Sequence, residues 1–170
     1  APVVRLADAR PMHLGHCIEA DARFRLFIFA PADDAGGQGG AVAALCDWLE
    51  HDPSSPVRRH TAPGEDVDAV IDTRAVFQQS FRELDFGAMP ALLRPPVGRY
   101  GLCDYEKVFC ADVKRGEDIF EMRGIDRAAG CVVVVRPDQY VGTILPLHAR
   151  DELAAYFAAI LRVRGRPAGA

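Results

Sequence analysis

The sequence predicts an α/β fold, in which helices cover both faces of a sheet of mixed strand direction. The nearly continuous apolar run 24–30 indicates a strand that is buried on both faces, and the β-branched run 131–135 is the strongest strand signal in the chain. Two further segments, around 42–49 and 153–161, carry apolar residues at helical spacing. The chain has 170 residues, of which 49% are hydrophobic and 26% are charged, as expected for one globular domain.

The first third of the chain predicts an arm, a strand and a helix. Residues 1–23 contain only short apolar pieces, which indicate an arm with one strand. The strand at 24–30 leads into a Gly-rich loop, and Gly40 opens a helix with one apolar stripe. Pro53 ends this helix, because proline disfavours helical backbone at the residue before it. The Pro-, Ser- and Arg-rich residues 53–66 then predict a loop.

The middle of the chain predicts a second strand and helix, and then a third strand. Weak alternation over 67–73 indicates a strand, and the apolar residues of 75–84 indicate a helix. Residues 85–101 hold three prolines and three glycines, which predict a long irregular loop. Such a loop inside a compact domain is often functional or lies at an interface. Residues 105–111 indicate the third strand.

A short helix with a well-marked end is predicted at 116–123. Gly124 can adopt the left-handed conformation that ends many helices, and Ile125 can then pack back on Phe120. Acidic residues in its first turn suit the positive end of the helix dipole.

A β-hairpin and a final helix complete the pattern. The β-branched run 131–135 is joined to a strand at 140–145 by the turn 136–139, in which proline presets φ and aspartate can bond the backbone. The last helix starts near Asp151 and carries its apolar residues on one face.

The order of these elements predicts a thioredoxin-like fold. A βαβ unit followed by a ββα unit builds a central mixed sheet that is flanked by helices. The chain is then divided into an N-terminal arm at 1–23, a thioredoxin-like domain at 24–164 and a flexible tail at 165–170. No internal repeat or second domain of comparable size is visible.

The corner between the first long strand and its helix lacks a nucleophile. Thioredoxin-like redox proteins hold their reactive cysteine at this point, whereas residues 31–40 contain no sulfur and the sequence has no C-x-x-C motif. A thioredoxin-type site also uses a proline just before the hairpin, and Gly130 stands there. We therefore expect the function to lie in assembly or in a larger parent protein.

The five cysteines are scattered and odd in number, which favours reduced thiols in a cytoplasm over a disulfide framework. Cys46 lies on a helical apolar stripe, and Cys110 and Cys131 lie in strands, so all three are predicted to be structural. Cys17 and Cys103 lie in less regular segments and could be accessible. They are the candidates for an atypical thiol-redox activity.

Other candidate sites have a structural interpretation that we favour. His13 and His16 would point to opposite faces of a strand, and no second ligand pair has zinc spacing. The Gly-rich stretch 36–40 lacks the lysine of a phosphate-binding loop, so a flexible connection is predicted. The adjacent carboxylates are predicted to be helix caps or solvated edges; these pairs are Asp33-Asp34, Glu65-Asp66 and Glu117-Asp118. No catalytic, cofactor-binding or metal-binding residue is therefore assigned.

The composition also argues against nucleic acid and membrane as partners. The net charge of −4 argues against a nucleic-acid surface, and the basic residues Arg162, Arg164 and Arg166 suit a solvated helix end. No stretch has the roughly 18 apolar residues of a membrane span, and no signal peptide is recognisable, so a cytoplasmic protein is expected. The chain opens with Ala1 in place of Met, which fits either an excised piece or a processed start.

Several sequence blocks resemble the C-terminal domain of FAD-dependent aromatic hydroxylases, the phenol 2-monooxygenase and 3-hydroxybenzoate 4-monooxygenase group. The resemblance covers nearly the whole chain. Its most specific part is the hairpin sequence Val132 to Asp138 with Tyr140-Val141-Gly142. The other blocks are Pro2 to Asp8, the strand at 24–30, Tyr105 to Phe109 and Gly124-Ile125-Asp126. The family often has glycine after Pro-Asp in the hairpin, where this chain has Gln139.

The resemblance implies a thioredoxin-like domain without redox cysteines that packs on a catalytic flavin domain and contributes to a dimer. FAD and NAD(P)H are then implied for the parent enzyme, in aromatic compound degradation, and neither for this chain alone. We expect the proline-rich segment 85–101 and the N-terminal arm to form contact surfaces. The alternatives are a stand-alone thiol-redox protein that uses Cys17 or Cys103, and a free-standing protein-interaction module.

Overall fold

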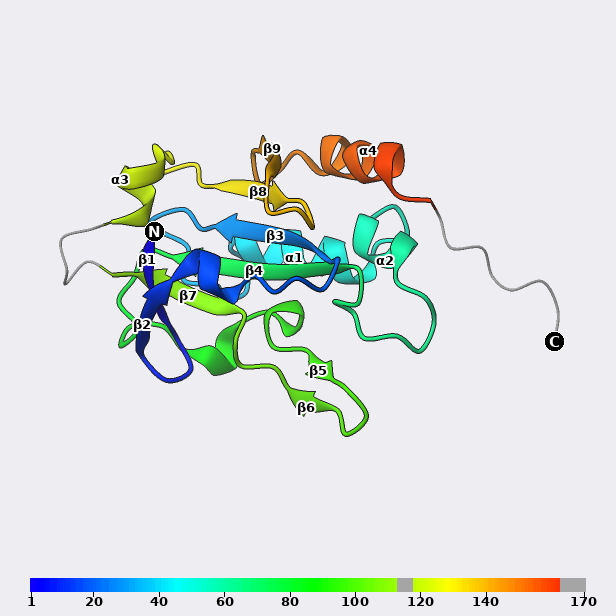
Figure 1. Cartoon of the computed structure of the whole chain (residues 1–170). Coiled ribbons are helices and arrows are strands. Elements are labelled where there is room, and N and C mark those ends of the chain that lie inside the picture. The colour runs from blue at the N-terminus through cyan, green and yellow to red at the C-terminus, as the bar shows by residue number, and fades with distance from the viewer. Residues whose placement is uncertain (113–117, 163–170) are drawn as a thin grey trace, which may run out of the picture.

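A mixed sheet forms the centre of the protein (Figure 1). The computed structural model describes residues 1–112 and 118–162, and within them the main sheet has seven strands in the order β2-β1-β7-β4-β3-β8-β9. These strands are β1 (Pro2–Arg5), β2 (Arg10–His13), β3 (Phe24–Phe29), β4 (Ile71–Phe77), β7 (Val108–Ala111), β8 (Cys131–Val135) and β9 (Val141–Leu145). A separate small hairpin pairs β5 (Pro96–Val97) with β6 (Leu102–Cys103).

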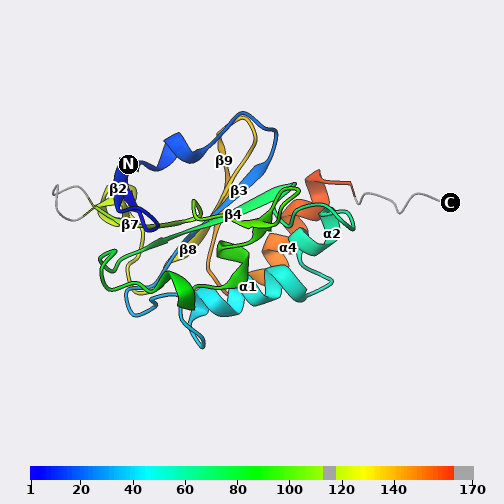
Figure 2. The ribbon, with the colours of Figure 1, turned by 90° about the horizontal axis from the view of Figure 1, so that it is seen from below.

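Helices cover the sheet unequally. The helices α1 (Ala41–His51), α2 (Pro56–His60) and α4 (Arg150–Ile160) gather on one face, as Figure 2 shows. The opposite face is covered by the short helix α3 (Ile119–Arg123) and by the 3-10 turn η1 (Leu14–Cys17). Two further 3-10 turns, η2 (Phe86–Ala88) and η3 (Ala91–Leu93), lie between β4 and β5.

The central strands have the predicted βαβ and ββα connections. β3 and β4 are parallel neighbours joined through α1 and α2, β8 runs antiparallel to β3, and β9 runs antiparallel to β8. α4 follows β9 and returns to the α1 face. The additional strands β7 and β1 extend the sheet beyond β4.

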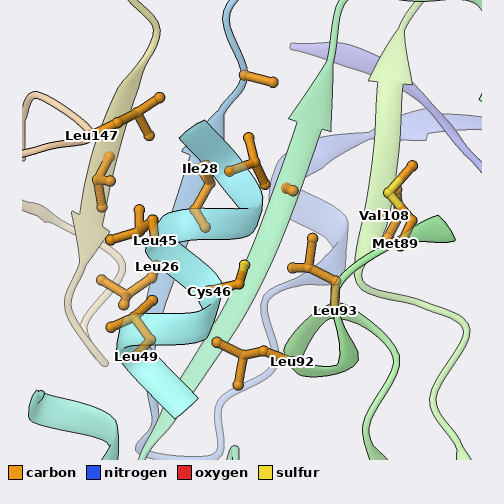
Figure 3. Close-up of a cluster of buried hydrophobic side chains, with 14 of the residues drawn as sticks. Leu26, Ile28, Leu45, Cys46, Leu49, Met89, Leu92, Leu93, Val108 and Leu147 are labelled. Atoms are coloured by element: carbon orange, nitrogen blue, oxygen red, sulfur yellow. The ribbon is translucent and has the colours of Figure 1, made fainter. Parts of the chain in front are cut away.

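The main hydrophobic core lies between the sheet and α1 (Figure 3). Leu26 and Ile28 of β3 point toward Leu45 and Leu49 of α1, and all four are almost completely buried. The alternate β3 residues point to the other face, where Phe29 meets Phe120 of α3 edge to face at 5.5 Å. β3 is therefore buried on both faces, as its continuous apolar sequence predicts.

Residues 1–23 contain two strands, whereas the sequence predicts one. β1 lies inside the sheet between β2 and β7, and the buried residues Val3 and Val4 pack on opposite faces of it. The backbone N–H of Leu6 continues this pairing by donating to the Val108 carbonyl at 2.9 Å. The short apolar pieces of this segment thus form sheet, because β7 offers them a partner. The division of the chain at residue 23 stays a prediction.

The helix predicted at 75–84 is wrong, because its first residues belong to β4. The strand runs from Ile71 to Phe77 and is buried along its whole length between β3 and β7. Residues 78–84 form bends and a turn. The apolar residues that suggested a helix are the last part of a central strand with two buried faces.

The loop predicted at 53–66 contains the short helix α2. Ser55 accepts a hydrogen bond from the Arg58 backbone N–H at 3.2 Å, and Pro56 occupies the first turn. These are favourable N-cap and N1 residues. The Ser-Pro pair that suggested a loop therefore starts a helix.

The predicted end of α3 is confirmed. Gly124 has φ 62°, and the backbone N–H of Ile125 donates to the Phe120 carbonyl at 2.8 Å. Asp118 accepts a hydrogen bond from the Phe120 N–H at 2.8 Å, so it caps the helix start. The predicted start of this helix at 116 lies outside the described residues, as do Glu117, Arg164, Arg166 and the tail at 165–170.

Candidate functional site

The corner between β3 and α1 is closed by the carboxylate of Asp34. This side chain is 6% exposed and accepts hydrogen bonds from the backbone N–H groups of Gly36 and Val42, both at 2.8 Å. A helix N-terminus is where a redox thiolate or a phosphate would be stabilised. In this chain a carboxylate of its own occupies that place, and the prediction that this pair contains a helix cap is confirmed for Asp34.

Glycines allow the corner to close. A Cβ atom at Gly40 would lie 2.5 Å from an Asp34 carboxylate oxygen, and Gly36 has φ +82°. At Gly130, with φ +61°, a Cβ atom would overlap the Phe29 carbonyl oxygen and lie 3.1 Å from the Pro31 nitrogen. The segment before β8 therefore packs directly on the corner, with glycine at the position where a redox relative uses proline.

The two most buried cysteines are shielded. Cys46 and Cys110 are almost completely buried, and burial raises the pKa of both thiols, for Cys110 to about 11. Burial also raises the pKa of the half-buried Cys131. A redox-active thiol needs a lowered pKa, so the structural role predicted for these three agrees with their surroundings.

The two candidate redox cysteines lie in separate elements. Cys17 ends η1, its Sγ lies 2.8 Å from the Leu14 carbonyl oxygen, and burial raises its pKa. Cys103 ends β6, with its Sγ 3.5 Å from the Arg94 carbonyl oxygen. Both thiols are free, and neither lies at the β3–α1 corner.

The histidine pair does not assemble a metal site within residues 1–112 and 118–162. The rings of His13 and His16 lie 5.4 Å apart between centroids. No third histidine, cysteine or carboxylate joins them as a possible ligand in this described part of the chain.

A buried network of charged side chains lies on the α3 face of the sheet, and the sequence reasoning missed it. The Lys107 Nζ contacts carboxylate oxygens of Asp68 and Asp72, both at 2.6 Å. Asp72 also pairs with Arg25 and Arg74, in each case at 2.9 Å. Lys107, Asp72 and Arg25 have no exposed surface. This network joins the three central strands β3, β4 and the start of β7.

The network also holds the segment before β3. Asp21 receives two hydrogen bonds from Arg25, the shorter at 2.7 Å, and Arg23 donates to Asp68 at 3.2 Å. Residues 18–23 therefore lie over charged strand residues. The signal in the sequence is the alternation of Arg25, Asp72 and Arg74 with apolar neighbours, which is easily taken for a solvent-facing strand side.

The positive and negative side chains of this network stabilise one another's charges. Burial alone would raise the pKa of Asp72, but the charges of Arg74 and Lys107 outweigh it, so the pKa is lowered. Burial alone would lower the pKa of Lys107, but Asp72 and Asp68 outweigh it, so the pKa is raised. Asp72 and Lys107 therefore stay charged at neutral pH, and neither is available as a general acid or base.

A shallow groove of about 690 Å³ runs along α1 opposite η2 and η3. Its polar lining includes Asp47, Glu50, His51 and Arg94. No nucleophile lines it, and the Asp34 carboxylate already accepts the Val42 N–H in the first turn of α1. The groove therefore offers no assembled catalytic set.

Among the described residues, exposed large apolar side chains occur singly at Met122 of α3 and Ile160 of α4, and together in two regions. One is the β5–β6 region, where Tyr100, Leu102 and Tyr105 are 79%, 68% and 53% exposed. The other is the hairpin end and β9, where Tyr140, Val141 and Ile144 are 72%, 57% and 61% exposed.

The predicted contact segments are only partly available to partners. Met89, Leu92 and Leu93 of the 85–101 segment are buried in the main core (Figure 3), and β1 of the N-terminal segment is largely buried. The end of the 85–101 segment, at Tyr100, is exposed. The sequence pattern predicts the β9 strand but does not mark it as a contact surface, because its alternating residues resemble an ordinary half-buried strand.

These features define a class: a thioredoxin-like α/β domain whose redox corner is closed by a carboxylate. In the solved structures, the reduced 2-Cys peroxiredoxin of Plasmodium vivax aligns with a TM-score of 0.50 over 94% of this chain and 90% of that chain, at 15% identity. This likeness confirms the thioredoxin-like fold and concerns the fold alone.

Sequence comparison identifies the family. The family described as phenol hydroxylase, C-terminal dimerisation domain, matches residues 1–165. The 3-hydroxybenzoate 4-monooxygenase of Comamonas testosteroni is 52% identical over 163 residues, which are 95% of this chain and 26% of that protein. The FAD-dependent monooxygenase terD of Aspergillus terreus is 28% identical over 172 residues, 99% of this chain and 28% of that protein. The chain belongs to the phenol hydroxylase C-terminal dimerisation domain family, as the resemblance of its sequence blocks predicts.

The chain spans about a quarter of the length of these curated relatives. Within the described residues, no helix is both long and apolar enough to cross a lipid bilayer.

Proposed function

We propose that this chain is a non-catalytic domain of a larger FAD-dependent aromatic hydroxylase, in which it supports folding and holds two copies of the parent together. The main support for this proposal is the match of residues 1–165 to the phenol hydroxylase C-terminal dimerisation domain family. The closed corner at Asp34 agrees with it, because the fold's usual position for redox chemistry is filled.

The partners in this proposal are the catalytic flavin domain of the same polypeptide and a second copy of the parent. The parent would use FAD, as the name of the terD relative states for that protein, and NAD(P)H as the reductant. A phenol or hydroxybenzoate type substrate would bind outside this chain. We place the protein in the cytoplasm, supported by five cysteines that are all free.

The first test is the reading frame upstream of Ala1. The proposal expects an open frame that encodes a flavin-binding domain. A start codon directly before this segment, preceded by a stop codon in the same frame, would contradict it.

The second test compares the parent enzyme with and without this domain. Removal of residues 1–170 should leave a flavin-binding protein that is monomeric in sedimentation velocity, whereas the intact parent is dimeric. The isolated chain titrated with FAD should leave the flavin fluorescence unchanged. A stoichiometric flavin complex of the chain, or a truncated parent that still dimerises, would refute the proposal.

The alternative of a thiol-redox protein is tested by insulin reduction and by peroxide consumption. We expect the chain to be inactive in both assays, because no thiol lies at the β3–α1 corner and burial raises the Cys17 pKa. Activity that disappears in the Cys17→Ser, Cys103→Ser double variant would favour the alternative.

A further inference from the structure

One edge of the main sheet is apolar and has no neighbour. β9 is the last strand in the order β2-β1-β7-β4-β3-β8-β9, so within the described residues no strand pairs with its outer side. Its sequence, Val141 to Leu145, contains no charged residue and no proline. Protein edges are normally protected by such residues or by a covering element, because an open edge templates pairing with another chain.

The open edge continues into an exposed apolar face. The register pairs Val133 with Ile144 and Val135 with Val141, so these four side chains share one side of the β8–β9 ladder. This is the α3 side of the sheet, where Val135 packs in the second core. Ile144 and Val141 are nevertheless 61% and 57% exposed, which leaves apolar surface next to an unpaired strand.

The opposite edge of the sheet is protected. β2 has the sequence Arg-Pro-Met-His, and its proline and charged residue are the devices that discourage edge pairing. β9 has neither proline nor charge, although a bulge at Gly142 interrupts its ladder with β8. Of the two ends of the main sheet, the β9 end is therefore the better suited to strand addition.

The position of the N-terminus separates the two edges further. Ala1 precedes β1, which lies next to the β2 edge. Four strands lie between β1 and β9, so the two are five inter-strand steps apart. At about 4.8 Å between strands, the β9 edge lies more than 20 Å across the sheet from β1. A domain joined through Ala1 would therefore connect to this chain on the far side of the sheet from β9.

We infer that the β9 edge is the surface on which a second copy of this chain docks, with the two β9 strands antiparallel about a two-fold axis. The inference rests on the proposed dimer role and deepens it by naming the surface. A two-fold axis makes the contact self-complementary, so Val141 and Ile144 of each copy extend the apolar face of the other. The second copy is favoured over another partner because the family is a dimerisation domain and the edge carries no charge to select a different chain.

The test introduces a positive charge at the β9 edge and, as a control, the same charge in the separate β5–β6 hairpin. Ile144→Lys and Val141→Lys introduce a lysine on the proposed surface, where it would be forced against its own copy. Leu102→Lys is the control, since Leu102 is a similarly exposed apolar strand residue, at 68%, in the separate β5–β6 hairpin. Sedimentation velocity over a concentration series gives the dimer dissociation constant, and circular dichroism checks that each variant is folded.

The inference expects the unsubstituted chain to be dimeric. It expects the dimer dissociation constant to rise at least about tenfold in both β9 variants and to change less than about threefold in Leu102→Lys. Folded β9 variants that dimerise like the unchanged chain would overturn the inference and leave the proposed function standing. So would a Leu102→Lys variant that dissociates as strongly as they do. A chain that is monomeric without any substitution would instead overturn the proposed dimer role itself.

Discussion

The ammonium group of Lys107 lies 2.6 Å from a carboxylate oxygen of Asp72, and neither side chain has exposed surface. The pair joins β4 to the residue just before β7 and is surrounded by Asp68, Arg25 and Arg74. The face of the sheet opposite α1 is thus held together partly by charge, in addition to the short helix α3 and the 3-10 turn η1 that cover it.

Replacing Lys107 by methionine should lower the free energy of unfolding by about 3–5 kcal/mol, because it leaves buried carboxylates without their shared partner. Urea unfolding followed by circular dichroism measures the change. Arg136→Met is the matched control, since Arg136 pairs with Asp138 at the half-exposed hairpin turn and should cost at most about 1 kcal/mol. An equal loss of unfolding free energy in the two variants would show that the burial of the Lys107 network does not add to its stabilising effect.

The same network predicts how stability depends on pH. The pKa of Asp72 is lowered in the folded chain, so its contribution is complete above the ordinary aspartate pKa of about 3.9 and is lost as the pH falls below it. The pKa of Lys107 is raised, so its contribution is complete below the ordinary lysine pKa of about 10.4 and is lost above it.

Urea unfolding between pH 2 and pH 11 should therefore show a plateau around neutral pH with a fall on each side. The Lys107→Met variant should have a shallower fall on the alkaline side. An unfolding free energy that stays constant from pH 5 down to pH 2 would contradict the role assigned to Asp72.

Thiol labelling should separate the cysteines by burial. Iodoacetamide at pH 8 should leave Cys46 and Cys110 unmodified in the folded chain, because both are almost fully buried and burial raises their pKa. Mass spectrometry of tryptic peptides measures the labelling, and the urea-unfolded chain, in which all five cysteines should react, is the control. Rapid labelling of Cys46 in the folded chain would show that the α1 core opens readily.

The hairpin turn contains a strained residue. Gln139 has φ 67°, and its backbone N–H donates to the Arg136 carbonyl at 2.8 Å. Gln139→Gly should raise the free energy of unfolding by up to about 1 kcal/mol, because glycine adopts this conformation without a Cβ clash. Gly124→Ala, at φ 62° on the end of α3, should lower it by about 1 kcal/mol. Thermal or urea unfolding of both variants checks the opposite signs.

Local sequence signals predict the elements that depend on neighbouring residues. The end of α3 at Gly124 follows from the backbone preference of a single residue, and it is observed. The thioredoxin-like order follows from two strongly apolar strands and two amphipathic helices. The absence of a cysteine in residues 31–40 is likewise visible in the sequence, and it predicts a corner without thioredoxin-type redox chemistry.

Features that depend on distant partners are not predictable from the same signals. Ala75 to Phe77 continue a strand because β3 and β7 lie on either side of it, and nothing local distinguishes them from the start of a helix. Likewise Lys107 meets Asp72 across 35 positions of sequence, so charged residues with an ordinary solvent-facing pattern turn out to be buried. That β9 lies at the edge of the sheet can be recognised only once the order of all the strands is known.

The most direct test of the account is the molar mass of the unmodified chain in solution, measured by sedimentation equilibrium at several concentrations. A domain whose purpose is assembly should reach twice the chain mass of 18.5 kDa as the concentration rises. A mass that stays at 18.5 kDa up to the highest concentration would contradict the claim that this domain holds two copies together.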